Sequence, residues 1–272
     1  MISLEDNFQN LDKSSLIFQM ESFSLSEINP EGKHEVLFHK GMTIECIQKF
    51  IDLYKERIIE KKQGYIKDLI DNFTIYIHFF DKKQGDILVI IYIDNKENRM
   101  DYTKLYHFSK SLFQRICSNI SSLEIEKICH TIIKIPKVEG MLAMFIVDEA
   151  GFLYYSKVSK KENCISQNKV QIAGFISAIL CFSQDYIGGK ESGFKLEAIN
   201  VGKANFYMNF KNDVIFAYLV EKKKKTEKMQ KYIELISEEF VDKYYEIHVK
   251  DFNGDLTPFH EFENIIEQYF II

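Results

Sequence analysis

The sequence has few of the features that mark secreted or membrane-spanning proteins. Its five cysteines are scattered without paired spacing, so no disulfide framework is expected. No uninterrupted apolar run approaches the roughly 20 residues of a membrane-spanning helix. The first residues lack the basic and apolar segments of a signal peptide. These absences predict a cytoplasmic protein without an integral membrane segment, although peripheral contact with a membrane stays open.

Arginine and proline are also scarce. Arg57, Arg99 and Arg115 are the only arginines, so the bidentate phosphate or carboxylate recognition that suits a guanidinium has few candidates. The formal net charge of −5 disfavours a nucleic-acid partner, which requires a basic face. One of the three prolines, Pro136, stands in the middle of the chain and suggests a break between two parts.

The chain is rich in apolar and aromatic residues. Apolar residues make up 46% of its 272 residues, aromatic residues 14% and charged residues 28%. This composition is typical of a globular protein with well-packed cores. The length suits one large domain or two of ordinary size.

The first half of the chain predicts a hairpin, a helix, further strands and a second helix. The hairpin has one strand beginning near Ser15, and its second strand spans residues 34–40, after a turn with Pro and Gly. The remaining predicted elements are an amphipathic helix at 42–62, β-branched and aromatic strands at 73–80 and 86–93, and a helix at 100–118. Residues 65–69 are a candidate additional strand, and residues 123–135 fit helix, strand or both.

The second half repeats this order. A hairpin is predicted at 141–158, followed by a helix at 168–187 that ends at Gly188 and Gly189. Three strands are then predicted at 194–199, 204–210 and 214–220, followed by helices at 226–245 and 258–270. Because tight turns join consecutive strands, we expect antiparallel sheets. The sequence thus predicts two α/β (α+β) domains, residues 1–135 and 136–272, each with a five-stranded antiparallel sheet and helices on both faces.

This order of elements resembles that of the longin and roadblock domains. The second half carries the likeness best, with Gly151 in its hairpin turn, and the first half resembles a diverged longin domain. The resemblance implies a non-enzymatic tandem-longin protein that binds or regulates a small GTPase in vesicle-trafficking assemblies. Two alternatives stay open, namely a scaffold subunit of a coat or tether complex, and a small-molecule sensor of the PAS or GAF type.

The motifs in the sequence predict no catalytic residue, no metal site and no cofactor. The sequence contains neither the His-Glu-x-x-His motif of zinc enzymes nor the Gly-x-Ser-x-Gly motif of hydrolases. His78 lies in an apolar strand and is expected to be a hydrogen-bonded core or edge residue. The basic run 222–225 fits either an anionic partner such as lipid or nucleic acid, or a solvated turn near glutamates.

The strongest functional signal is the predicted helix at 168–187, which carries no charged residue from Val170 to Gln184. A surface helix normally has a polar face, so we expect this helix to be covered on both sides. On a helical wheel, Ile172, Ile176, Ile179 and Tyr186 form the expected sheet-facing stripe, Gly174, Ser177 and Cys181 form the back, and four residues lie beside the stripe. These four are the predicted interface: Gln171, Phe175, Ala178 and Phe182. Their contact is either interdomain or with a partner protein, including a homo- or hetero-oligomer.

Overall fold

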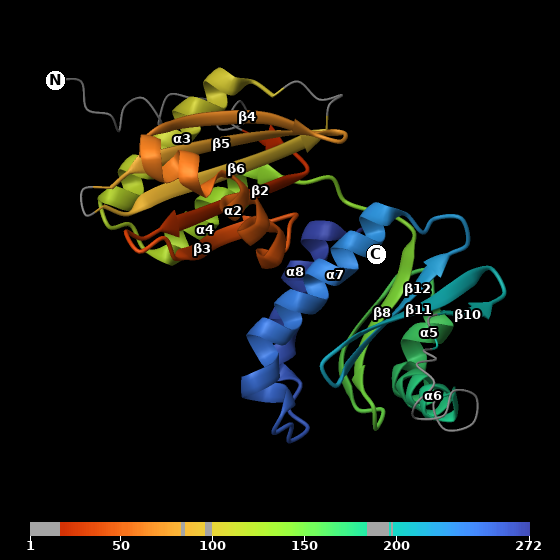
Figure 1. Cartoon of the computed structure of the whole chain (residues 1–272). Helices are drawn as coiled ribbons and strands as arrows, with labels where there is room; N and C mark the ends of the chain where they lie inside the picture. The colour runs from red at the N-terminus through yellow and green to blue at the C-terminus, as the bar shows by residue number, and fades with distance from the viewer. Residues whose placement is uncertain (1–16, 83–84, 96–99, 184–195, 197) are drawn as a thin grey trace. The chain divides into compact units, whose positions relative to one another are not determined.

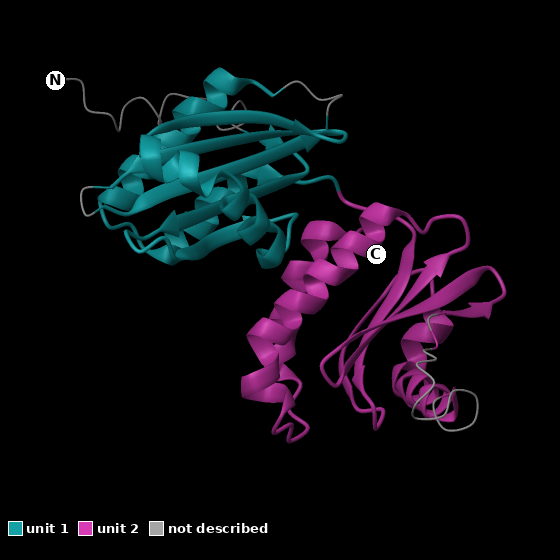
Figure 2. Cartoon of the chain, viewed as in Figure 1, with its two compact units in different colours: residues 1–136 teal, residues 137–272 magenta. Residues whose placement is uncertain are grey.

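The computed structural model describes residues 17–82, 85–95, 100–183, 196 and 198–272. The chain forms two compact units, Met1–Pro136 and Lys137–Ile272 (Figure 2). Pro136, which suggested a break in the sequence, is therefore the last residue of the first unit.

Unit 1 is built around a five-stranded antiparallel sheet (Figure 1). Its sheet strands are β2 (Ser22–Ile28), β3 (His34–Lys40), β4 (Gly64–Ile70), β5 (Phe73–Asp81) and β6 (Ile87–Asn95). The helices among its described residues are α2 (Ile44–Lys61), α3 (Tyr102–Cys117) and α4 (Ser122–Ile132). The strands lie side by side in the order β3-β2-β6-β5-β4. The hairpin β2–β3 therefore pairs through β2 with β6, the last strand of the following meander.

Both faces of this sheet are packed with apolar side chains. Helix α2 covers one face with Ile47, Ile51 and Ile58, against strand residues that include Ile77 and Val89. Helices α3 and α4 cover the other face in a second apolar cluster. Because β6 is buried on both faces, it reads as a continuous apolar run, and this explains why the sequence identified it so clearly.

The first predicted strand of the chain is wrong in one respect. A single strand was expected to begin near Ser15, but the backbone changes partner at Met20. Phe18 and Gln19 form the short strand β1, which pairs in parallel with β7 (Ile133–Lys134). The amide of Met20 donates to Lys134, whereas the amide of Glu21 donates to Ile93 of β6. The undecided stretch 123–135 contains both a helix, α4, and a strand, β7.

Unit 2 has the same arrangement. Its strands are β8 (Met141–Asp148), β9 (Leu153–Val158), β10 (Ala198–Val201), β11 (Ala204–Lys211) and β12 (Val214–Glu221), and its helices include α5 (Asn163–Gln167), α6 (Lys169–Phe182), α7 (Glu227–Phe240) and α8 (Phe262–Tyr269). The sheet order is β9-β8-β12-β11-β10, which matches unit 1 strand for strand. The predicted fold class is confirmed in both units.

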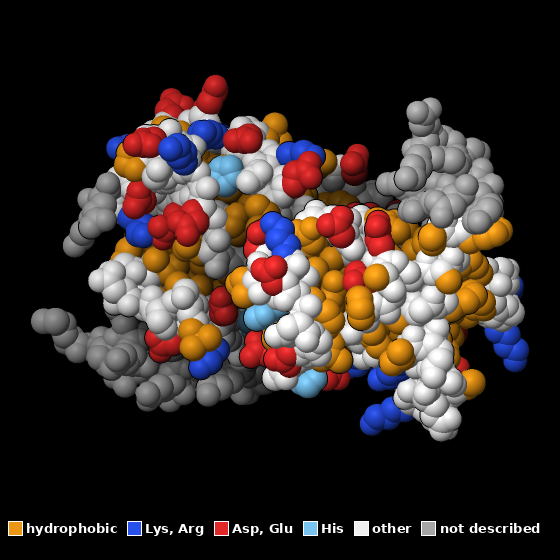
Figure 3. Space-filling model, turned by 90° about the horizontal axis from the view of Figure 1, so that it is seen from below, with side chains coloured by type: hydrophobic (Ala, Val, Ile, Leu, Met, Phe, Trp, Pro, Cys, Tyr) orange, Lys and Arg blue, Asp and Glu red, His pale blue; other side chains and the backbone are white. Residues whose placement is uncertain are grey.

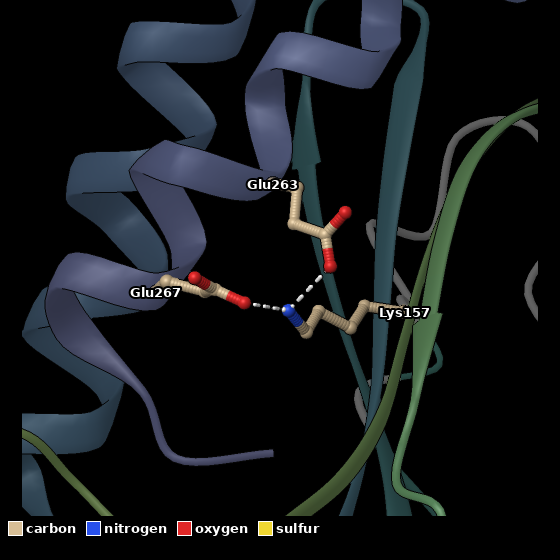
Figure 4. A network of polar contacts seen from close by, with 3 residues as sticks. All are labelled: Lys157, Glu263 and Glu267. Carbon is tan, nitrogen blue, oxygen red and sulfur yellow. Dashed lines mark hydrogen bonds and ion pairs between the residues drawn. The ribbon is translucent and has the colours of Figure 1, made fainter.

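The two faces of the unit 2 sheet are covered by different helices. Helix α6 packs on one face, and α7 and α8 pack on the other, where Phe216 contacts Phe240 and Tyr155 contacts Phe262. An ion-pair network ties the edge strand β9 to α8. The ammonium of Lys157 lies 2.7 Å from Glu263 and 2.6 Å from Glu267 (Figure 4).

The long helix expected at 226–245 changes its winding. It is α-helical to Phe240 and continues as a π-helical segment, Val241–Val249. The final helix likewise begins with a 3-10 turn, Thr257–Glu261, before α8. Apolar periodicity identified both segments as helical, but it cannot distinguish these windings because each of them keeps an apolar side toward the sheet.

Some expectations concern residues outside the described part of the chain. These are the start of the first strand at residues 15–16, the predicted helix end at 184–189, and residues 194, 195 and 197 of the strand predicted at 194–199. Within the described ranges, none of the helices combines the length and apolar character required to cross a bilayer.

Candidate interaction surface

Helix α6 rests on its sheet through a side that combines two small residues with two larger apolar ones. Ala173, Ile176, Ser177 and Leu180 are buried, and three of them belong to the apolar cluster that includes Phe145. Small side chains let the helix axis approach the sheet and the neighbouring turn closely. The inner side of α6 is therefore fixed by packing, which leaves the outer side free to serve another purpose.

The turn between β8 and β9 holds α6 in place. The hydroxyl of Ser177 donates to the backbone carbonyl of Glu149. Gly151 has a φ of +90°, and a Cβ added there would lie 3.3 Å from both the Cα of Gly174 and the Cβ of Ser177. This turn therefore requires glycine both for its left-handed backbone and for its close approach to the helix.

These contacts correct the expected orientation of the helix. Ser177 was placed on the back of the helix, but it is buried against the turn. Of the expected sheet-facing stripe, Ile176 is buried, Ile172 and Ile179 are only partly buried, and Tyr186 lies outside the described residues. The predicted stripe was centred on the largest apolar side chains, whereas the close approach of the turn also buries the small residues Ala173 and Ser177.

The four predicted interface residues, Gln171, Phe175, Ala178 and Phe182, are all exposed. They are spaced by three or four residues and share the side of α6 opposite the sheet, not its flank as expected. Phe175 is 47% exposed and Phe182 is 54% exposed. We call these four residues the outer face of α6. Hydrophobic side chains reach the surface of unit 2 in the view of Figure 3.

The sequence-based set omitted one neighbour. Val170, at the first turn of the helix, is 70% exposed. Its signal was present, because the uncharged run begins at this residue. The described part of α6 has no charged side chain after Lys169.

The outer face can bind by excluding water. Complete burial of a phenylalanine side chain contributes about 1.5–3 kcal/mol, so covering the exposed half of each ring would contribute about 1 kcal/mol. Gly174, exposed beside Ala178, allows a partner backbone to approach closely. The face therefore suits an apolar, uncharged surface of another protein segment and has no group for charge-based recognition.

The most perturbed histidine lies elsewhere, in the core of unit 1. His78 is 1% exposed, and burial lowers its pKa to about 4. Its Nδ1 and Nε2 lie 2.7 Å from the hydroxyls of Ser109 and Tyr76, respectively. Ser109 donates to the carbonyl of Leu105 and also contacts the hydroxyl of Tyr92. Neutral His78 satisfies every member of this network, and the expectation of a hydrogen-bonded core histidine is confirmed.

Neither His78 nor the buried cysteine offers an accessible reactive group. Burial raises the pKa of the Cys129 thiol to about 12, which keeps it protonated and unreactive. Among the described residues, no group of three or more His, Cys, Asp or Glu side chains is placed to hold a metal ion. The outer face of α6 is thus the candidate site with the clearest physical rationale.

Comparisons with known proteins add no evidence to this assignment, which rests on the residues of the chain itself. No protein-family model and no curated protein matches the sequence.

Proposed function

We propose that this chain is a non-enzymatic tandem-longin interaction protein that binds or regulates a small GTPase in membrane-trafficking-type assemblies. The order on which the longin resemblance rests, a hairpin, a helix, three strands and C-terminal helices, is present in both units. The outer face of α6 carries the proposal, because its exposed phenylalanines are the surface that a protein partner would cover.

The interaction role is favoured over a small-molecule sensor. A sensor of the PAS or GAF type would require an enclosed polar pocket against its sheet. In unit 1, apolar clusters occupy both faces of the described sheet. In unit 2, the face under α6 is filled by a third apolar cluster. Because these faces are filled by apolar side chains, they support binding of a protein partner at the surface over binding of a small molecule inside the domain.

Affinity capture with a matched control tests the proposal. The full chain and the Ala178→Asp/Phe182→Asp variant would be used to capture partners, which mass spectrometry would identify. Direct binding to a captured GTPase would then be measured with purified proteins. We expect the variant to lose the GTPase, because two carboxylates would be desolvated in the contact. The control Leu53→Asp/Ile59→Asp changes two exposed apolar positions of α2 and should keep binding.

Two outcomes would contradict the proposal. If the α6 variant remains folded by circular dichroism, keeps its elution volume and still binds the same partners, the outer face is not the contact. If the reproducible partner is a coat or tether subunit and no GTPase binds, the structural-subunit alternative replaces the GTPase role.

A further inference from the structure

Three loops of unit 2 meet at one end of its sheet. The turn between β10 and β11 contains Lys203, and the connection between β12 and α7 contains the basic run 222–225. The amide of Lys222 donates to the carbonyl of Lys203, with a donor–acceptor distance of 3.0 Å. The amide of Glu221 donates to the carbonyl of Gly140 over the same distance, which attaches the segment before β8.

This arrangement adds a fifth lysine to the run of four. Lys203 is separated from Lys222 by 18 residues in the sequence, but strand pairing of Ala204 with Glu221 places the two loops side by side. All five lysines are exposed. We call Lys203 and Lys222–Lys225 together the lysine end of unit 2. Four of its members are adjacent in the sequence, and only the sheet register brings Lys203 to them.

The ammonium groups of the lysine end are available to a ligand. In the described part of the chain, no carboxylate lies within ion-pair distance of any of the five. Lys225 makes one internal contact, with its ammonium 4.0 Å from the ring centroid of Tyr207. Three exposed glutamates, Glu139, Glu221 and Glu227, stand in the same loops or next to them, so the lysines exceed the nearby acids.

The chemistry of this cluster fits a diffuse negative surface. Lysine presents a point charge on a flexible stem, whereas bidentate recognition of a single phosphate favours arginine, which the cluster lacks. A polyanion such as nucleic acid that extended beyond these loops would meet the rest of a chain with net charge −5. A bilayer instead presents many acidic headgroups to this end of unit 2 at once. Val201, 41% exposed beside Lys203, adds an apolar side chain at the same edge.

We infer that the lysine end of unit 2 docks on the surface of an anionic lipid bilayer. The contact is electrostatic, with the lysines attracted to acidic headgroups. It does not depend on the outer face of α6 or on any protein partner. A chain with both surfaces would bring its partner to a membrane of suitable charge.

The test is vesicle co-sedimentation of the full chain. Vesicles of phosphatidylcholine alone would be compared with vesicles containing about 30% phosphatidylserine at low ionic strength. We expect binding to the acidic vesicles only, and loss of binding at about 0.5 M salt, where the charges are screened. Lys222→Gln/Lys223→Gln should weaken partition by about tenfold or more. The control Lys160→Gln/Lys161→Gln, an exposed lysine pair of the same unit, should leave it unchanged.

Three results would overturn the inference. The first is equal sedimentation with neutral and acidic vesicles. The second is an equal loss of binding in the control pair, which would show only a general effect of charge. The third is binding to duplex DNA or RNA that is tighter than binding to acidic vesicles at the same salt concentration and is lost in the Lys222→Gln/Lys223→Gln variant.

Discussion

Helices α2 and α6 hold the same place in their units but present different surfaces. Both follow the first hairpin and pack one apolar side on the sheet. The exposed side of α2 carries charges, including an ion pair between Lys49 and Glu45 at 2.6 Å, whereas α6 has no charged residue after Lys169. The fold requires only the inner side of this helix. The fold does not constrain the outer side, so the polarity of its side chains indicates whether it faces water or another apolar surface.

The opposite faces of the two sheets show a second difference. Ser109 of α3 and Ser237 of α7 are both fully buried, and each donates to the carbonyl of the residue four positions earlier. Each also forms a hydrogen bond with a polar residue of the middle strand of the meander, β5 in unit 1 and β11 in unit 2. That residue is His78 in unit 1 and Asn209 in unit 2. The same helix-to-strand link is thus titratable in unit 1 only.

The largest predicted effect is a difference in unfolding free energy between substitutions on the inner and outer sides of α6. Ile176→Asp should destabilise unit 2 by about 4 kcal/mol or more, because it removes a buried side chain and buries a carboxylate. Ile51→Asp should act similarly on unit 1, because both isoleucines face their sheets. Phe175→Asp on the outer face should change the unfolding free energy by less than about 0.5 kcal/mol. Hydrogen exchange of sheet peptides, measured by mass spectrometry, reports each unit separately.

An equally large loss with Phe175→Asp would contradict this prediction. It would show that the outer face is already covered within the chain, which is the interdomain alternative.

The second prediction compares buried serines within unit 1. Ser109→Ala should cost about 3 kcal/mol, because it leaves the Nδ1 of His78 and the hydroxyl of Tyr92 without their hydrogen bonds to Ser109. The hydroxyl of Ser24 is buried without a partner among the described residues, so Ser24→Ala should be neutral or stabilise by up to about 1 kcal/mol. Urea unfolding of both variants checks the contrast. A loss of equal size at both positions would mean that cavity formation outweighs hydrogen bonding.

The third prediction concerns pH. His78 has a folded-state pKa of about 4, below the unfolded value of about 6.5. Its contribution to stability is complete above pH 6.5 and is lost as the pH falls toward 4, because only the unfolded state binds the proton. Unit 1 should lose about 2 kcal/mol by pH 5 through this group. Asn209, the corresponding residue of unit 2, binds no proton in this range.

His78→Gln provides the control for the pH prediction. Glutamine keeps hydrogen-bonding capacity but does not titrate, so the difference between pH 7.5 and pH 5 in hydrogen exchange of β5 should shrink. An unchanged pH dependence in this variant would assign the acid sensitivity of unit 1 to another group. His130 is one such group, because burial also lowers its pKa to about 4.

The order of elements could be predicted from the sequence. The continuous apolar run of β6 and the 3,4 spacing of Ile47, Ile51 and Ile58 correspond to elements buried by the sheet, so local patterns carry the information. The lack of charged residues from Val170 to Gln184 likewise identified α6 as the helix with an unusual outer side. Such signals depend on residues close together in the chain, which is why they can be read without a structure.

Only the tertiary structure decided which residues of these elements meet. The side of α6 that faces the sheet depends on the close approach of Gly151 and the hydrogen bond of Ser177, made by a turn more than 20 residues away. The grouping of Lys203 with Lys222 depends on the register of β11 and β12. Strand pairing and close packing join residues that are distant in sequence, and neither leaves a periodic trace in the local pattern.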